Sequence, residues 1–363
     1  MEKEMKHKRN IWIMLYCLVL TAFTAYFLLD TFVIARVYAV EGAAATGSTQ
    51  AADTAAGSPQ TQQSQQTENA SSKASLNSNS LENQTEQESG TTENNLNQDG
   101  GTSILGSTGG QTAVAKTVTP VITETSYTDE NISIAISEYE QDDTVIYVAD
   151  VKLSSPEYLK TALAQGIYGK NVTDETSSIA KSADAILAIN GDYYGSQQKG
   201  YVIRNGVLYR STAVAGRQDL VIYADGSFEI ITEGQVSAEE LLANGAVQVL
   251  SFGPGIIENG EVSVSSSYEV ARAKTSNPRT AIGVIDELHY VLVVADGRTA
   301  ESEGLSVYEL AKFMQSLGVQ TAYNLDGGGS STMYFNGSII NNPTTNGRTI
   351  KERSVSDIVY IGY

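Results

Sequence analysis

The stretch Asn324-Leu325-Asp326-Gly327-Gly328-Gly329-Ser330-Ser331-Thr332 decides how this chain is expected to turn and where its chemistry lies. Three consecutive glycines come after an expected strand over residues 322–325, and they permit positive φ and close approach of a ligand to the backbone. Successive exposed amides bind anions. The run is not a P-loop, because it has no lysine and residues 333–335 are typical of a strand. The alternative is a tight turn that carries polar side chains.

The N-terminus carries a membrane signal. Basic residues precede an apolar stretch from Ile11 to Leu29, which is long enough to cross a hydrocarbon core as a helix. We expect residues 1–41 to be a cytoplasmic tail and signal anchor, with the membrane contacted through residues 11–34 and the rest of the chain outside the cell. The alternative is a cleaved signal peptide, which would give a secreted protein.

Composition divides the remaining chain into a spacer and a domain. Residues 42–117 are rich in Ser, Thr, Gln and Asn and are expected to be a disordered linker, since they contain too few apolar groups to offset the entropy of ordering. Residues 118–363 are expected to form one domain. The only cysteine, Cys17, lies in the apolar segment, so the domain has no thiol chemistry. The net charge of -19 argues against nucleic acid as a partner.

Turn signals predict an α+β domain with mixed or antiparallel sheets and a few packed helices. One N-terminal membrane helix and the disordered spacer precede it in the sequence. Four Asn-Gly or Asp-Gly pairs, at residues 205–206, 225–226, 259–260 and 336–337, lie between runs of β-forming residues, which is typical of hairpins. Ser306 and Glu309 form a capping-box pattern before an amphipathic helix that Gly318 would end. Further helices are expected at residues 155–165 and 174–182.

Polar residues gather at the ends of expected strands. They occur in Asn190-Gly191-Asp192, in Asp296-Gly297-Arg298, beside Arg279, and at Asn324 and Asp326. Strand ends held by a rigid sheet are common positions for functional sites. The two histidines, His7 and His289, do not suggest a catalytic triad, so carboxylates, amides, arginines and hydroxyls remain for chemistry. Each Asp-Gly or Asn-Gly pair could alternatively be an ordinary turn.

The order of these motifs resembles the phosphodiester glycosidase family, whose bacterial members are often described as exopolysaccharide biosynthesis proteins. The resemblance covers nearly all of the expected domain. Its motifs are Asn190-Gly191-Asp192-Tyr193-Tyr194, Gly253-Pro254-Gly255, Pro278-Arg279-Thr280-Ala281-Ile282-Gly283, Asp296-Gly297-Arg298, the triple-glycine run and Arg353-Ser354-Val355-Ser356. The chain departs from the family at Asp192, Tyr193 and Tyr194, where a second glycine and Phe are common, and at Asp357, where Asn is common.

The resemblance implies a hydrolase that cleaves a sugar 1-phosphodiester in a cell-surface glycan or sugar-phosphate polymer. The implied catalytic carboxylates are, in order of preference, Asp326, Asp296 and Asp192. The implied substrate-binding residues are Asn190, Gly191, Arg279, Arg298, Asn324, Gly327, Gly328, Gly329, Ser330, Ser331 and Arg353. No cofactor is required, and Ca²⁺ or Mg²⁺ held by carboxylate and amide oxygens stays an open alternative.

Two other functions fit the same residues. One is a non-catalytic module that binds a cell-wall glycan or exopolysaccharide, for which a tyrosine-rich surface is suited. The other is a phosphodiesterase that cuts the P–O bond of the same linkage. Turnover separates the first from a glycosidase, and the destination of solvent oxygen separates the second.

Overall fold

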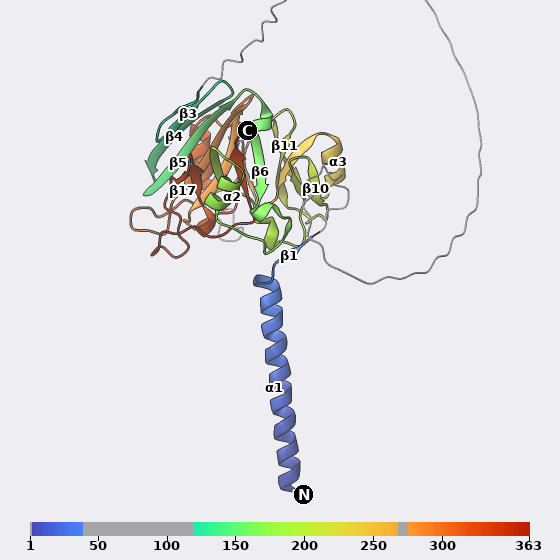
Figure 1. Ribbon diagram of the computed structural model, residues 1–363. Coiled ribbons are helices and arrows are strands. Elements are labelled where there is room, and N and C mark those ends of the chain that lie inside the picture. The colour runs from blue at the N-terminus through green and yellow to red at the C-terminus, as the bar shows by residue number, and fades with distance from the viewer. Residues whose placement is uncertain (1, 39–118, 268–274) are drawn as a thin grey trace, which may run out of the picture. The chain divides into compact units, whose positions relative to one another are not determined.

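A computed structural model describes residues 2–38, 119–267 and 275–363, so the linker expected over residues 42–117 lies outside the described residues. The described part is an α+β fold, as expected (Figure 1). Its helices are α1 (Glu2–Phe32), α2 (Thr176–Ser182), α3 (Ala238–Ala243) and α4 (Val307–Ser316). Short 3-10 turns occur at Pro156–Tyr158, Ala164–Gly166, Tyr194–Ser196 and Gly328–Ser330.

The largest sheet has nine strands, and every pair of neighbours in it is antiparallel. Its order is β15 (Glu261–Val262), β14 (Gly255–Glu258), β18 (Thr321–Asn324), β16 (Arg279–Asp286), β17 (His289–Ala295), β5 (Thr144–Leu153), β4 (Ile132–Gln141), β3 (Ser126–Thr128) and β2 (Val121–Ile122). Both faces of its centre are buried. Along β17, Tyr290 and Leu292 pack in one core cluster while Val291 and Val293 pack in a second one with α4. This explains why β17 is almost continuously apolar.

Two five-stranded antiparallel sheets complete the domain. The first has the order β10 (Val207–Arg210), β9 (Val202–Arg204), β13 (Ala246–Leu250), β11 (Gln218–Tyr223) and β12 (Phe228–Thr232). The second has the order β20 (Ser338–Ile339), β19 (Met333–Phe335), β8 (Leu187–Asn190), β21 (Asp357–Ile361) and β6 (Leu159–Leu163). A short pair joins β1 (Arg36–Val37) to β7 (Gly169–Lys170). One buried apolar cluster contains residues of all three large sheets, including Leu187, Leu250 and Leu292.

Most local expectations are confirmed. Each of the four predicted turns joins two antiparallel strands, namely β9–β10, β11–β12, β14–β15 and β19–β20. The capping box of Ser306 and Glu309 begins α4, and Gly318 follows its C-cap with φ of 83°. The sequence analysis missed α3, although Ser237 caps it by accepting a hydrogen bond from the amide of Glu240.

The helix expected over residues 155–165 is wrong. Pro156–Tyr158 forms a 3-10 turn, the chain continues as β6, and a second 3-10 turn follows at Ala164–Gly166. Strand β6 pairs along its whole length with β21, so that Leu159 lies opposite Ile361 and Leu163 opposite Asp357. A partner strand about 200 residues away therefore overrides the local preference of this segment.

A buried group of charges joins the two five-stranded sheets. Arg204 at the end of β9 is 2% exposed. Its guanidinium lies 2.8 Å from a carboxylate oxygen of Asp357 in β21 and 2.7 Å from one of Asp192, which follows β8. Both carboxyl groups are fully buried. Breaking such a group by removing one charge leaves another charge buried without compensation, which is strongly destabilising.

One positive charge faces two carboxyl groups in this cluster, so the stability of the fold should depend on pH. Burial and the charge of Asp192 raise the pKa of Asp357 to about 7, although Arg204 opposes the shift. An acid with a raised folded pKa stabilises the fold at low pH and loses that contribution as pH rises through about 7. We expect Asp357→Asn to abolish this part of the decline in unfolding free energy between about pH 4 and 7.

Denaturant titrations at several pH values measure this effect as a difference in slope between the variant and the original chain. Asp286→Asn, which changes an exposed carboxyl group at the end of β16, is the matched control. Parallel pH profiles for Asp357→Asn and the unmodified chain would contradict the prediction.

Candidate active site

A pocket of about 570 Å³ lies where loops from all three large sheets meet. Seven of the residues predicted from the sequence line it: Arg279, Arg298, Asn324, Asp326, Gly327, Gly328 and Arg353. They come from the ends of β16, β17 and β18, from the glycine run and from the segment before β21. The pocket therefore combines one carboxylate with several guanidinium groups.

Asp326 is the carboxylate of this pocket. One of its oxygens accepts hydrogen bonds from the Ser330 hydroxyl at 2.6 Å and from Arg353 Nη2 at 3.1 Å. The Nε atom of Arg353 also donates to the Ser330 hydroxyl, at 3.0 Å. Burial raises the pKa of Asp326, and Arg353, Ser330 and the Gly327 amide partly offset this rise. The result is an oriented, poorly solvated carboxylate beside a cation.

The glycine run is a 3-10 turn that brings backbone and arginine close together. Gly328 has φ of 63°, and a Cβ atom there would lie 2.8 Å from Nη2 of Arg298. A side chain at this position would therefore be strained and would collide with the guanidinium. The amides of Gly328 and Ser330 donate to the carbonyl groups of Pro278 and Gly327. These two amides are thus used within the protein.

Arginine side chains are held in place by carbonyl and amide oxygens. Arg279 donates from Nε to the Leu305 carbonyl at 2.8 Å and from Nη2 to the Thr275 carbonyl at 2.9 Å. Arg298 donates from Nη2 to Oδ1 of Asn277 at 3.0 Å. Burial, together with the charge of Arg298, lowers the pKa of Arg279 to about 10, so its guanidinium stays protonated at neutral pH. The pocket is cationic although the whole chain is acidic.

Asn324 offers an acceptor to the pocket. Its Nδ2 atom donates to the Gly253 carbonyl at 2.8 Å, which fixes the orientation of the amide. Its Oδ1 atom is buried and accepts no hydrogen bond from any residue that the structure describes. Buried polar atoms are normally paired, and this oxygen has an acceptor position that no described residue fills.

The other two predicted carboxylates lie outside the pocket lining. Asp192 belongs to the buried cluster with Arg204 and also accepts from the Ser251 amide at 2.7 Å. Asp296 is buried beyond β17 and accepts hydrogen bonds from the side chains of Asn341 and Asn342. Burial raises the pKa of Asp296, and these amide donors oppose the rise. Asp192 thereby holds the Ser251 segment, which lines the pocket, whereas Asp296 holds residues 341–342.

The remaining predicted residues support the glycine run from behind. Asn190 donates from Nδ2 to the Asp326 carbonyl at 2.6 Å and accepts at Oδ1 from the Thr280 hydroxyl at 2.8 Å. The carbonyl of Gly191 accepts from the Asp326 amide. Gly329 packs against Thr345, and Ser331 is fully buried. A Cβ atom at position 191 would lie 2.2 Å from Oδ1 of Asp357, so a residue other than glycine would collide there.

Sequence reasoning missed other lining residues, namely Tyr193, Gln197, Arg217, Ser251, Phe252, Pro254, Asn277 and Val307. Tyr193 was identified only as a departure from the family motif. Its φ of 77° is rare for a bulky residue and costs about 1–2 kcal/mol. Arg217 and Phe252 have no signal in the sequence. Arg217 precedes β11 and Phe252 follows β13, and these two strands pair with each other.

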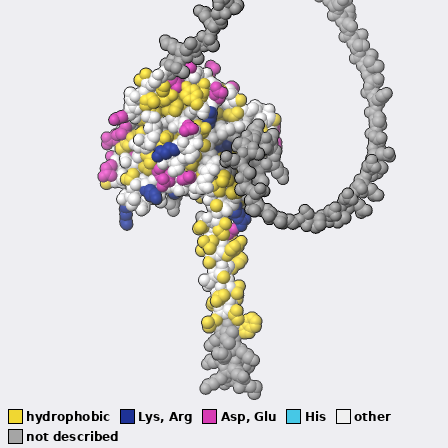
Figure 2. All heavy atoms as spheres, viewed as in Figure 1, with side chains coloured by type: hydrophobic (Ala, Val, Ile, Leu, Met, Phe, Trp, Pro, Cys, Tyr) yellow, Lys and Arg dark blue, Asp and Glu magenta, His cyan; other side chains and the backbone are white. Residues whose placement is uncertain are grey.

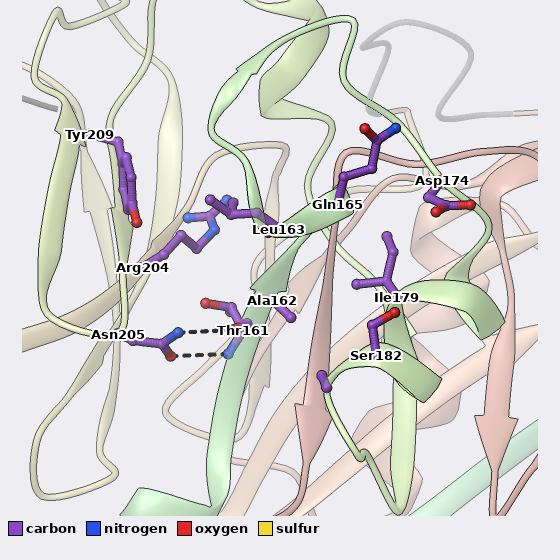
Figure 3. Close-up of a pocket in the computed structure, with 12 residues that line it drawn as sticks. Thr161, Ala162, Leu163, Gln165, Asp174, Ile179, Ser182, Arg204, Asn205 and Tyr209 are labelled. Atoms are coloured by element: carbon purple, nitrogen blue, oxygen red, sulfur yellow. Dashed lines mark hydrogen bonds between the residues drawn. The ribbon is translucent and has the colours of Figure 1, made fainter. Parts of the chain in front are cut away.

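A second pocket, of about 250 Å³, lies beside β6 and α2 (Figure 3). Arg204 lines it, but its guanidinium binds the two buried carboxyl groups. Asn205 and Thr161 close one side through two hydrogen bonds, at 2.8 and 3.2 Å. The described lining holds Asp174 as its only carboxylate and has no arginine besides Arg204. This pocket is less suited to acid–base chemistry than the one around Asp326.

The part of the chain that the structure describes contains no group of three His, Cys, Asp or Glu side chains arranged to hold a metal ion. His289 lies on β17, with Nε2 at 3.0 Å from a carboxylate oxygen of Asp150.

The chain is similar in sequence to known proteins. Residues 183–362 match the sequence profile of the phosphodiester glycosidase family. The SPbeta prophage-derived uncharacterized protein YomE of Bacillus subtilis is 27% identical over 270 residues, which is 68% of this chain and 41% of that protein. N-acetylglucosamine-1-phosphodiester alpha-N-acetylglucosaminidase of Mus musculus is 32% identical over 182 residues, covering 46% of this chain and 34% of the mouse protein.

The fold is also similar to a solved structure. The catalytic domain of the zebrafish N-acetylglucosamine-1-phosphodiester alpha-N-acetylglucosaminidase superposes with a TM-score of 0.52 at 23% identity, covering 64% of this chain and 83% of that one. The chain spans less than half the length of the curated relatives above. Residues 183–362 contain Asp326, the four arginines that line the pocket and the glycine run. The chain therefore contains a domain of the phosphodiester glycosidase family.

Proposed function

We propose that this protein hydrolyses a sugar 1-phosphodiester of a cell-surface glycan at the bond between the anomeric carbon and the phosphate oxygen. The observation that carries the proposal is the shared pocket of Asp326 with Arg279, Arg298 and Arg353. The phosphate of a glycosyl phosphate is an anion that guanidinium groups can bind. Its anomeric carbon becomes positively charged in the transition state, and a carboxylate can stabilise that charge.

The reaction needs little acid catalysis on the leaving group. Water adds to the anomeric carbon and gives one proton to a base or to solvent, the C–O bond breaks with its electron pair going to oxygen, and a phosphomonoester leaves. A phosphate with a second pKa of about 6 is a weak base, so it can depart without a histidine to protonate it. The guanidinium groups stabilise the charge that develops on it.

Asp326 then has one of two roles, as a nucleophile or as the base that activates water. In both it must be ionised and close to the anomeric carbon. Ser330 and Arg353 fix its orientation, and Asn324 Oδ1 can accept a hydrogen bond from a sugar hydroxyl or from the water. Asp192 and Asp296 act through the loops that they hold.

The anchor is proposed from α1. Residues Trp12–Thr31 are long and apolar enough to span a membrane, and their side chains are mostly exposed, as Figure 2 shows along the helix. A helix of this composition placed in lipid would hold the enzyme at the cell surface, where a surface glycan is within reach.

Asp326→Asn should lower kcat by about a hundredfold or more, because the amide removes the charge while keeping the shape. The assay uses the full chain in detergent with an α-N-acetylglucosaminyl phosphodiester and a panel of other sugar 1-phosphodiesters, and it follows phosphomonoester release. The control is Asp286→Asn. In H₂¹⁸O the label should enter the sugar.

Three outcomes would contradict the proposal. Asp326→Asn turning over as fast as the unmodified chain would remove Asp326 from the reaction. Label in the phosphate would indicate a phosphodiesterase, and retention of unchanged diester by the unmodified chain would indicate a binding module.

Arg353→Gln should shift the acidic limb of the kcat/KM profile to higher pH. Arg353 lowers the pKa of Asp326, so its removal raises that pKa, and the ionised form then appears only at higher pH. The plateau should also fall, since one phosphate contact is lost. The measurement is the position of the limb, fitted separately from the plateau. An unshifted limb would mean that ionisation of Asp326 does not determine the acidic limb.

The anchor gives a separate prediction. The full chain should stay with membranes during alkaline carbonate extraction, and its intact mass should include residues 1–41. A chain lacking residues 1–38 should be released into the soluble fraction. Recovery of the unmodified chain from the medium with a new N-terminus within residues 38–46 would instead establish a cleaved signal peptide.

A further inference from the structure

Two aromatic side chains stand at the surface of an otherwise polar pocket. Tyr193, on the segment after β8, is 41% exposed, and Phe252, after β13, is 38% exposed. Their ring centroids are 6.5 Å apart and the rings are nearly perpendicular, at 85°. Both residues line the same pocket as Asp326, Arg279, Arg298 and Arg353. Large apolar side chains that are exposed beside a polar site are commonly binding surfaces.

The backbone at Tyr193 is strained. Among the described residues, the non-glycine positions with positive φ are mostly Asp and Asn, and the others are Gln165, Tyr193, Leu288 and Arg298. Tyr193 and Arg298 both line this pocket. Glycine would adopt the conformation of Tyr193 at no steric cost, and the exposed ring gains little from the protein core. The strain therefore points to a use for the ring itself.

The chemistry of the pocket indicates what the ring contacts. Guanidinium groups of Arg279, Arg298 and Arg353 suit the phosphate, which leaves the aromatic pair for an uncharged part of the ligand. A pyranose ring presents C–H groups on one face, and these pack on aromatic rings, while its hydroxyls can reach Asn324 Oδ1 and the Ser251 side of the pocket.

We propose that Tyr193 and Phe252 form the wall on which the sugar ring of the substrate stacks. The assignment rests on the proposed function, and it adds the residues that recognise the sugar as distinct from the phosphate. The alternative is that the wall contacts the group on the other side of the phosphate. Binding of a sugar phosphate that lacks this group distinguishes the two.

The test compares two anions that share the phosphate end. Calorimetry with the full chain in detergent gives dissociation constants for N-acetylglucosamine 1-phosphate and for inorganic phosphate. In Tyr193→Gly the advantage of the sugar phosphate over phosphate should fall by about tenfold, while the affinity for phosphate itself stays unchanged. Tyr193→Phe restores the ring and should restore the ratio.

Gln165→Gly is the matched control, because it relieves the same kind of left-handed backbone at an exposed position that does not line this pocket. Phe252→Ala tests the second ring without altering the backbone at Tyr193 and should also lower the ratio. Thermal melting of each variant confirms that it is folded, and Tyr193→Gly should melt no lower than the unmodified chain.

An unchanged ratio in both Tyr193→Gly and Phe252→Ala would overturn the proposal. If these variants keep the ratio of sugar-phosphate to phosphate affinity but bind a diester more weakly, the wall faces the group beyond the phosphate, which also overturns the proposal. If the unmodified chain cleaves no diester but the ratio falls as expected, the proposed function fails and the sugar wall stands.

Discussion

The contact between Arg204 and two buried carboxyl groups is the constraint on which the pocket depends. It ties β9 in one five-stranded sheet to β21 in the other, and through Asp192 it holds the turn after β8. The same Asp192 carboxylate accepts the Ser251 amide, so the segment that carries Phe252 is held too. The carbonyl of Gly191 then receives the Asp326 amide. Buried charge thus fixes loops from separate sheets around one pocket.

This arrangement separates residues that hold the site from residues that face the ligand. Asn190, Asp192 and Asp296 are buried and fully engaged with the protein, whereas Asp326 and Arg353 face the pocket. Polar residues of the first kind are needed because loops with unpaired buried groups would be costly. Two strained backbone positions, Tyr193 and Arg298, lie in the pocket wall itself, and their cost is carried by the surrounding sheets.

The sequence predicted what is decided locally. Asn-Gly and Asp-Gly turns, the capping box of Ser306 and the glycine run are determined by a few adjacent residues, and each of these turns and the cap formed as expected. The segment at 155–165 was predicted wrongly, because its partner β21 is distant in sequence. For the same reason the sequence could not tell which of three carboxylates faces the pocket. That depends on whether Arg204, Asn341 or Arg353 is its neighbour.

The most direct test of this account is a crystal structure of the Asp326→Asn chain with an intact sugar 1-phosphodiester. The anomeric carbon should lie beside residue 326, with the phosphate among the guanidinium groups of Arg279, Arg298 and Arg353. A diester bound in the pocket beside β6 and α2, or one whose phosphate lies away from all three arginines, would contradict it.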